Sequence, residues 1–297
     1  MPELRREPVV GRWVVIKSDP TLCPEDFEKE DNTPRKQATC PFCEGKEYLT
    51  PPEVGAIRSR DSKPNAPGWK VRVVPNKFPA LKPEGPFEKM GIGIYDMTTG
   101  IGAHEVVIET PGHNQQLADL SVEDLQGVIE TYMDRVKELS KNKRFKYICI
   151  FKNFGESAGT SLEHGHSQVI ALPTVPKFVF EELEGSRYYF RYRGRCIFCD
   201  IIHQEHQDKE RIVLESSAFL AFCPFAPRFA FETWIIPKRH AADFTTMNNI
   251  EKADLAKVLK DILSRIKTVL SNPSYNFFLH IAPNDYDFPE SYHWHIE

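Results

Sequence analysis

The 297-residue sequence lacks several features that would mark whole classes of protein. No apolar run approaches the roughly 18 residues of a membrane-spanning helix. The first residues, MPELRREPVV, contain no apolar stretch like that of a secretory signal. Basic clusters are also missing, and a formal net charge of -4 argues against a nucleic-acid surface. We therefore expect a cytoplasmic globular protein whose length is typical of about two domains.

A complete set of disulfide bonds is also excluded, because the sequence has seven cysteines, an odd number. Four of them form two Cys-x-x-Cys motifs, at Cys40 and Cys43 and at Cys196 and Cys199. In a chain without a secretory signal, closely spaced cysteines are more often metal ligands than disulfide partners. The two motifs therefore indicate metal binding, and each has phenylalanine before its second cysteine.

The two motifs belong to an internal repeat. Each is followed by one histidine and then by a His-x-His pair, and the corresponding histidines are 127–129 residues apart: His113, His164 and His166 in the first half, and His240, His293 and His295 in the second. Apolar residues with a period near 3.6 predict an amphipathic helix over 121–139 and another over 255–269. Strand-like runs at 104–109, 147–151, 231–237 and 277–281 flank these helices. Pro- and Gly-rich stretches at 45–70 and 79–102 are expected to be loops, and 174–195 is expected to bridge the halves.

Two thiolates and two imidazoles suit a tetrahedral Zn²⁺ ion. The first half offers such a set in Cys40, Cys43, His113 and His164. The second half offers Cys196, Cys199, His240 and His293, so two zinc sites per chain are expected, and the second ion could instead be iron. A different second site, made of His280, His295 and a carboxylate such as Glu181 or Glu182, is an alternative.

The segment His164-Gly-His166-Ser-Gln168 carries the clearest signal for chemistry. Alternate residues of a strand share one face, so these three polar side chains are expected to form a row. A metal ion that fixes His164 would leave His166 rigid and free to attack phosphorus. The preceding loop, from Asn153 to Ser161, offers glycines, hydroxyls and backbone amides that suit a phosphate. The simpler alternative is an exposed polar strand face followed by its turn.

The repeated arrangement resembles the galactose-1-phosphate uridylyltransferase family of the histidine-triad superfamily. The stretches that carry the resemblance are EPVVGRWVVIKSDP, VVPNKFPAL, NFGESAGTSLEHGHSQ, FETWIIPKRH and YHWHIE. The resemblance implies an α+β fold made of two histidine-triad-like halves, each an antiparallel sheet with flanking helices, here at 1–176 and 190–297. It also implies a homodimer.

The same resemblance implies roles for individual residues. His166 would be the nucleophile that becomes uridylylated or adenylylated, with Gln168, Asn153, Gly159 and Ser161 around the phosphates. Asn76 and Phe78 would lie near the base and ribose. The second half has Glu297 in place of the glutamine two residues after the histidine pair, so it would bind metal without chemistry.

The resemblance implies transfer of UMP between UDP-glucose and galactose 1-phosphate through a covalent nucleotidyl-histidine. Three alternatives remain. One is an ADP-glucose or nucleotide-sugar phosphorylase with inorganic phosphate as acceptor, a second is a zinc-stapled binding protein, and a third is a hydrolase. The stretch 18–27 lacks arginines that many members have near the phosphates, and many members continue further beyond the histidine pair. Acceptor binding is therefore expected to differ.

Overall fold

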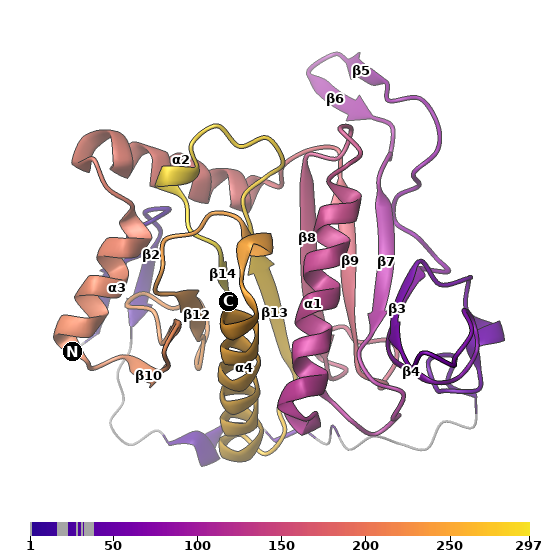
Figure 1. Ribbon diagram of the computed structural model, residues 1–297. Helices are drawn as coiled ribbons and strands as arrows, with labels where there is room; N and C mark the ends of the chain where they lie inside the picture. Colours follow the sequence, from indigo (N-terminus) through magenta and orange to yellow (C-terminus); the bar gives the residue numbers. More distant parts are fainter. Residues whose placement is uncertain (1, 17–22, 28, 31, 33–38) are drawn as a thin grey trace.

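The core of the molecule is one antiparallel sheet. The computed structural model describes residues 2–16, 23–27, 29–30, 32 and 39–297, and its ribbon is drawn in Figure 1. Within these residues ten strands pair in the order β3-β4-β7-β9-β8-β13-β14-β12-β11-β10. The first five are β3 Gly55–Arg58, β4 Trp69–Pro75, β7 Ala103–Ile108, β9 His166–Leu172 and β8 Tyr147–Phe154. The second five are β13 Tyr275–His280, β14 His295–Ile296, β12 Trp234–Pro237, β11 Phe219–Phe222 and β10 Ile212–Glu215.

The strand order shows the duplication directly. Each half contributes five strands, and the order of the second half mirrors that of the first. The predicted α+β class with antiparallel strands and flanking helices is confirmed. The two expected sheets are joined, because β8 and β13 pair along residues 150–154 and 275–279. Both strands would otherwise be edges with unpaired backbone groups, so pairing them satisfies the hydrogen bonds of both halves.

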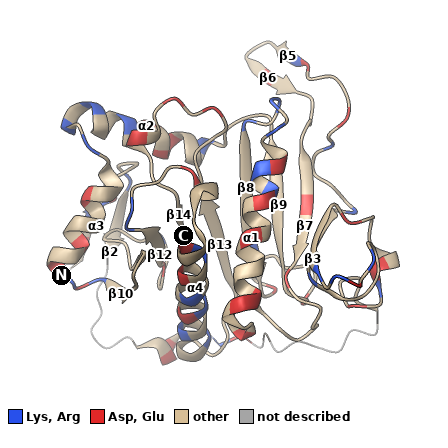
Figure 2. Ribbon diagram, in the orientation of Figure 1, with Lys and Arg blue, Asp and Glu red and all other residues tan. Residues whose placement is uncertain are grey.

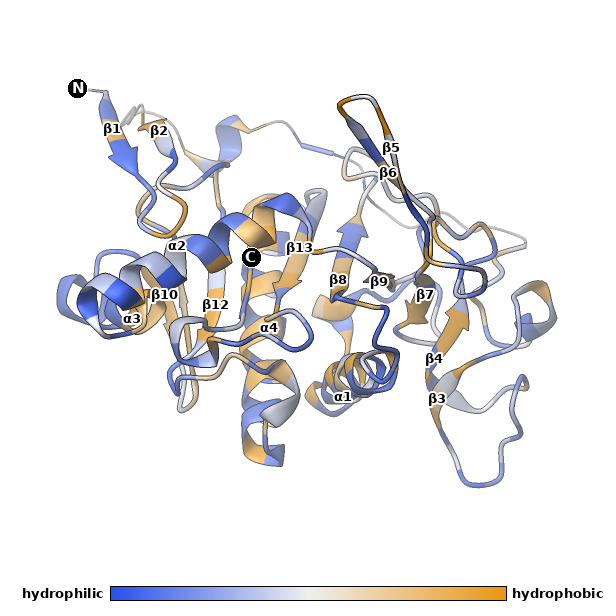
Figure 3. Ribbon diagram, turned by 90° about the horizontal axis from the view of Figure 1, so that it is seen from above, coloured by the Kyte–Doolittle hydropathy of each residue, from blue (hydrophilic) through white to orange (hydrophobic). Residues whose placement is uncertain are grey.

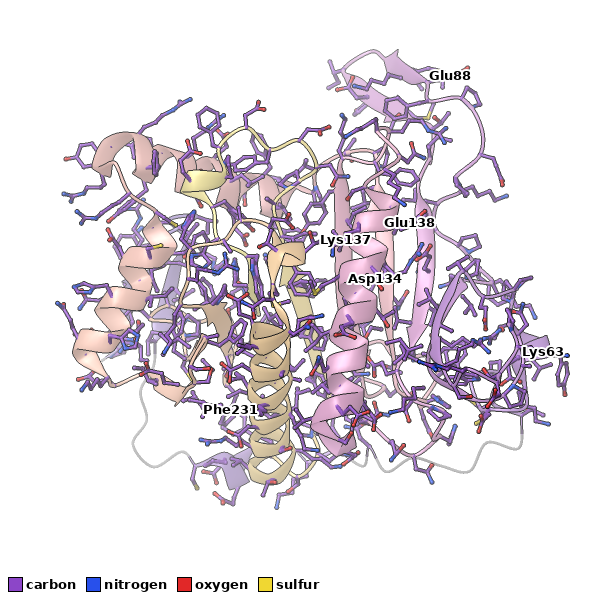
Figure 4. The ribbon with its side chains drawn as sticks, in the orientation of Figure 1. Lys63, Glu88, Asp134, Lys137, Glu138 and Phe231 are labelled. Carbon is purple, nitrogen blue, oxygen red and sulfur yellow. The ribbon has the colours of Figure 1, made fainter. Side chains whose placement is uncertain are left out.

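Two long helices cover one face of the sheet, as the repeat predicts. These are α1 Val122–Leu139 and α4 Asn249–Val269, which pack against each other (Figure 1). The Ser121 hydroxyl caps α1 by accepting from the amide of Asp124, and Asn248 caps α4 in the same way. Apolar residues of both helices belong to the same buried core as those of the strands. Asp134, Lys137 and Glu138 lie on the exposed side of α1 (Figure 4).

Some stretches expected to be loops contain strands. Residues 45–70 include β3, which pairs with β4. Residues 79–102 include a separate hairpin of β5 Lys89–Ile92 and β6 Tyr95–Thr98. Gly93 turns this hairpin with a φ of +62°, a conformation that glycine adopts at little cost. The Pro and Gly residues therefore mark the ends of short strands rather than continuous loops.

Over the second half, helices and a hairpin cover the opposite face of the sheet. The bridge between the halves is α2 Lys177–Arg193, which leads into α3 Ile197–Asp208. The N-terminal hairpin, β1 Glu3–Arg6 and β2 Trp13–Ile16, lies on the same side (Figure 3). A Cβ atom at Gly185 of α2 would clash with the backbone oxygen of Val9, so the glycine allows this close approach. Over the first half, the segment around Cys40 and Phe42 packs on the corresponding face and lines a pocket there.

The surface carries charges of both signs. Acidic and basic residues are interspersed along α2 and α4 (Figure 2). Among the described residues, none of the helices is both long enough and apolar enough to cross a membrane.

Candidate active site and metal centres

The four predicted ligands of the first metal site lie together near the start of β9, which His164 precedes by two residues. Cys43 Sγ is 3.5 Å from His113 Nδ1 and 3.6 Å from His164 Nδ1, and Cys40 Sγ is 3.7 Å from His164 Nδ1. A tetrahedral ion about 2.3 Å from sulfur and about 2.1 Å from nitrogen keeps its ligands roughly 3.6 Å apart. His164 Nε2 donates to the Thr110 carbonyl oxygen at 2.7 Å, which leaves its Nδ1 lone pair for the ion. These residues therefore fit Zn²⁺ or a similar ion.

The second half repeats this geometry. Cys196, Cys199, His240 and His293 form a matching group. Cys199 Sγ is 3.4 Å from His240 Nδ1 and 3.8 Å from His293 Nδ1. His293 Nε2 donates to the Pro237 carbonyl oxygen at 2.8 Å, just as His164 bonds to Thr110. The donor set again fits a tetrahedral ion.

A third group of possible ligands lies beside the second. Glu182, His280, His295 and Glu297 offer ligand atoms that all lie within 4.8 Å of one another. This group contains the alternative second site considered from the sequence, and it selects Glu182 rather than Glu181. It coexists with the Cys2His2 group instead of replacing it. Arg228 also forms an ion pair with Glu297, so the group is partly balanced by a protein cation.

The imidazole of His166 is held in a single tautomer. Its Nδ1 lies 2.8 Å from the His164 carbonyl oxygen. A carbonyl oxygen can only accept a hydrogen bond, so Nδ1 carries the proton and Nε2 keeps its lone pair. Burial and the positive charge of Lys152 lower the pKa of His166 to about 4, which keeps the ring neutral at physiological pH. Phe42 of the first Cys-x-x-Cys motif packs edge-on against the ring, with centroids 5.3 Å apart.

A pocket of about 770 Å³ opens on the face of the sheet that carries His166. Seven of the residues that line it are those expected to act on the substrate: Asn76, Phe78, Asn153, Gly159, Ser161, His166 and Gln168. They come from the turn after β4, from β8 and β9, and from the loop between β8 and β9. The structure thus brings every predicted catalytic and substrate residue to one cavity large enough for a nucleotide sugar.

His104 on β7 fixes the orientation of the Gln168 amide. The backbone amide of Ala80 donates to His104 Nδ1 at 3.1 Å, so the proton of this ring is on Nε2. Nε2 then donates to Gln168 Oε1 at 2.7 Å. With its oxygen occupied, Gln168 presents its amide NH₂ group as a donor, the polarity that a phosphate oxygen requires.

Asn276 of the second half orients Asn153 in the same way. Its Nδ2 donates to Asn153 Oδ1 at 2.7 Å and to the Ala158 carbonyl oxygen at 3.0 Å. The Asn153 NH₂ group is therefore also a donor on the side of the pocket. The loop itself depends on Gly155 and Gly159, whose φ angles are +87° and +84°. Since β13 carries Asn276, the second half supports a site that belongs to the first.

The residues predicted to lie near the base and ribose form a turn directly after β4. The Asn76 side-chain oxygen accepts from the backbone amide of Phe78 at 2.9 Å, which fixes this turn. The Phe78 ring is 82% exposed and is thus available to an incoming ring. Residues 18–22 of the segment that lacks arginine lie outside the described residues.

Two family models cover almost the whole chain. The galactose-1-phosphate uridyl transferase N-terminal domain matches residues 1–176, and the C-terminal domain of the same family matches residues 182–297. This chain belongs to the galactose-1-phosphate uridyl transferase family. An ADP-glucose phosphorylase from Arabidopsis thaliana is 37% identical over 95% of this chain and 79% of its own length. A galactose-1-phosphate uridylyltransferase from Thermotoga maritima is 29% identical over 100% of this chain and 86% of its own length.

Solved structures agree with this membership. A crystal structure of an ADP-glucose phosphorylase from Arabidopsis thaliana with bound ADP-glucose has a TM-score of 0.80. It is 34% identical, and the match covers 100% of this chain and 88% of that one. A uridylyltransferase structure has a TM-score of 0.75 at 28% identity, over 100% of this chain and 85% of that one. The family and fold expected from the sequence are both confirmed.

Two residues that orient pocket amides, His104 and Asn276, were not predicted from the sequence to have a role. His104 carried a usable signal, because in the predicted strand 104–109 it shares a face with Val106 and Ile108, next to the pocket. Asn276 carried none, because its contact with Asn153 depends on the pairing of β8 with β13. Local sequence patterns do not reveal which edge strands of two halves meet.

Proposed function

We propose that the protein transfers a nucleotidyl group from a nucleotide sugar to a phosphate acceptor through a covalent intermediate on His166. The observation that supports this most is the unprotonated His166 Nε2 in a pocket where the amide side chains of Asn153 and Gln168 both present their NH₂ groups as donors. A nucleophile with positioned donors for the phosphoryl oxygens is the arrangement that phosphoryl-type transfer needs.

The first half-reaction is a direct displacement. His166 Nε2 attacks the α-phosphorus, the N–P bond forms, and the bond to the leaving hexose 1-phosphate breaks with its electron pair on that oxygen. Hexose 1-phosphate is a good leaving group and needs little help from a general acid. A phosphate oxygen of the acceptor then attacks the same phosphorus and restores the imidazole, so no proton has to leave Nδ1.

The donor and acceptor that we favour are ADP-glucose and inorganic phosphate. The relative at 37% identity is an ADP-glucose phosphorylase. The second candidate is UMP transfer between UDP-glucose and galactose 1-phosphate, favoured by the family models and by the Thermotoga maritima relative. Both reactions use the same residues and differ in the base and in the acceptor.

Several broader properties belong to the same proposal. The chemistry resides in residues 1–176, while 190–297 is a second, silent half. A Zn²⁺ ion in each Cys2His2 group, with iron an alternative in the second half, would hold strand and loop together and supply no reacting group. The protein would be a homodimer of the cytoplasm.

Mass spectrometry of the intact protein tests this proposal. Incubation with ADP-glucose or UDP-glucose should add one AMP or UMP, and His166→Ala should remove the adduct. Discharge of the adduct by inorganic phosphate or by galactose 1-phosphate then identifies the acceptor. A folded, metal-loaded protein that forms no adduct with either donor would instead be a zinc-stapled binding protein.

A further inference from the structure

A fully buried ion pair lies directly behind the strand that carries His166. Lys152 on β8 and Glu109 at the end of β7 reach across β9 from its two sides, and Lys152 Nζ is 2.7 Å from Glu109 Oε2. Their side chains are 1% and 0% exposed. Burying two charges costs several kcal/mol per ion before their attraction offsets it, so such a pair is not explained by stability alone.

The pair is bonded to the nucleophile and to its neighbour. Lys152 Nζ also donates to the backbone carbonyl oxygen of His166 at 3.1 Å. Glu109 accepts from the Ser167 hydroxyl and, at 3.4 Å, from Tyr132 of α1. His166 faces the pocket and Ser167 faces the helices, because successive residues of a strand alternate. The ring therefore reacts on one face of β9 while a cation and an anion sit on the other.

The charge of the ring changes during the proposed reaction. When Nε2 bonds to phosphorus, the proton stays on Nδ1, hydrogen-bonded to the His164 carbonyl oxygen, so the nucleotidylated ring carries a positive charge that the free ring lacks. A nearby ammonium group raises the free energy of that state, and a nearby carboxylate lowers it. Both effects are large in a buried site, where water does not screen them.

We infer that Lys152 and Glu109 set the free energy of the nucleotidyl-His166 intermediate relative to the free enzyme. Lys152 keeps the intermediate reactive enough to pass its nucleotidyl group on, and Glu109 keeps it stable enough to form. Both are positioning residues, since neither touches the substrate. This inference rests on the proposed function.

The internal equilibrium of the first half-reaction tests it. Full-length, metal-loaded enzyme is mixed with α-phosphate-labelled nucleotide sugar and varied hexose 1-phosphate, and the labelled fraction is measured after quenching. Lys152→Met should shift the equilibrium about tenfold toward the nucleotidyl-enzyme. Glu109→Gln should shift it in the opposite direction by a similar factor, and the double variant should return near the wild-type value.

Opposite signs distinguish this role from a structural one. A pair that only holds β9 in place would slow labelling in both single variants without moving the equilibrium, and that result would overturn the inference. Lys152→Arg keeps the cation and should keep the wild-type equilibrium, which serves as the matched control. If Lys152→Met does not fold, two expectations remain: Glu109→Gln should shift the equilibrium away from the nucleotidyl-enzyme, and the double variant should restore the wild-type value. Wild-type enzyme that never becomes labelled would refute the proposed function itself.

Discussion

The two halves of the molecule place a histidine in the same position, but His166 lines a pocket of about 770 Å³, whereas the pocket beside His295 has only about 50 Å³. His295 Nδ1 donates to the His293 carbonyl oxygen at 3.0 Å, as His166 does to His164. Phe198 of the second motif packs against His295 with centroids 5.0 Å apart, as Phe42 does against His166. The metal group, the strand and the tautomer are therefore shared by both halves and do not by themselves create an active site.

The difference lies in what surrounds the second nitrogen of each ring. The ring of His295 is fully buried, stacked between Trp234 and His280 at centroid distances of 5.1 and 4.7 Å. Its Nε2 faces Glu297 at 3.5 Å, where the first half has Gln168. Although burial opposes it, the charges around Glu297 hold the pKa of this carboxyl at about 2. A permanent anion repels phosphate, whereas an oriented amide donates to it, so access and polarity decide which half reacts.

Replacing each of the two histidines by alanine gives the largest expected difference between the halves. His166→Ala should reduce turnover by about 10⁵-fold, since the nucleophile is lost. His295→Ala should leave adduct formation nearly unchanged, because its ring has no route to substrate. Intact mass and steady-state rates measure both. A His295→Ala enzyme that folds, binds metal and fails to label would show that the halves are not divided as described.

Removal of one thiolate from each metal group should separate chemistry from stability. Cys43→Ser should abolish binding of the first ion and lower turnover about 10²-fold or more. Without the ion, His164 and its carbonyl oxygen, which orients His166, are no longer held in place. Cys199→Ser should cost the second ion and lower the melting temperature, while most of the activity survives. Metal content, melting temperature and rate are measured on the same samples. Equal loss of activity in both variants would contradict the division.

Replacing Gln168 by glutamate, the residue that the second half has at the matching position, tests whether a negative charge there prevents reaction. Gln168→Glu should lower the rate of labelling about 10²–10³-fold, because it replaces a donor to the phosphoryl oxygens with a carboxylate. Gln168→Ala should cost less, since it removes the donor without adding a charge. The reverse change, Glu297→Gln, should leave the rate unaltered. If the two Gln168 variants are equally slow, repulsion is not the reason for the silence of the second half.

The smallest expected effect concerns the contact between the halves. Asn276→Ala frees the Asn153 amide to rotate and should lower the rate about tenfold, within the net value of a hydrogen bond to a reacting group. Asn276→Asp keeps an oxygen but cannot donate, so it should be no better. His104→Ala should have a similar effect through Gln168. Rates that match the wild type in all three would mean that the amides need no support.

Much of this arrangement was predictable because it depends on short-range patterns. The alternation predicted a row of His164, His166 and Gln168. His166 and Gln168 do share one face of β9, whereas His164 lies before the strand. The 3.6-residue spacing of apolar residues predicted both α1 and α4. The strands within 45–70 and 79–102 were missed, because each is four residues long and surrounded by glycine and proline. Strands this short are stable only through their partner, which the local pattern does not show.

The sequence by itself determined the duplication, the family, the two Cys2His2 sets and the residues that share the pocket, since each is written in spacing and side-chain chemistry. Only the tertiary structure decided how the halves join, which atom of the Gln168 and Asn153 amides faces the pocket, and which histidine is accessible to a substrate. Those properties arise from contacts between residues far apart in the chain: β8 with β13, His104 with Gln168, and His295 with Trp234 and His280. A hydrogen bond or an ion pair between such residues has no signature in the order of the amino acids, because its strength depends on distance and burial.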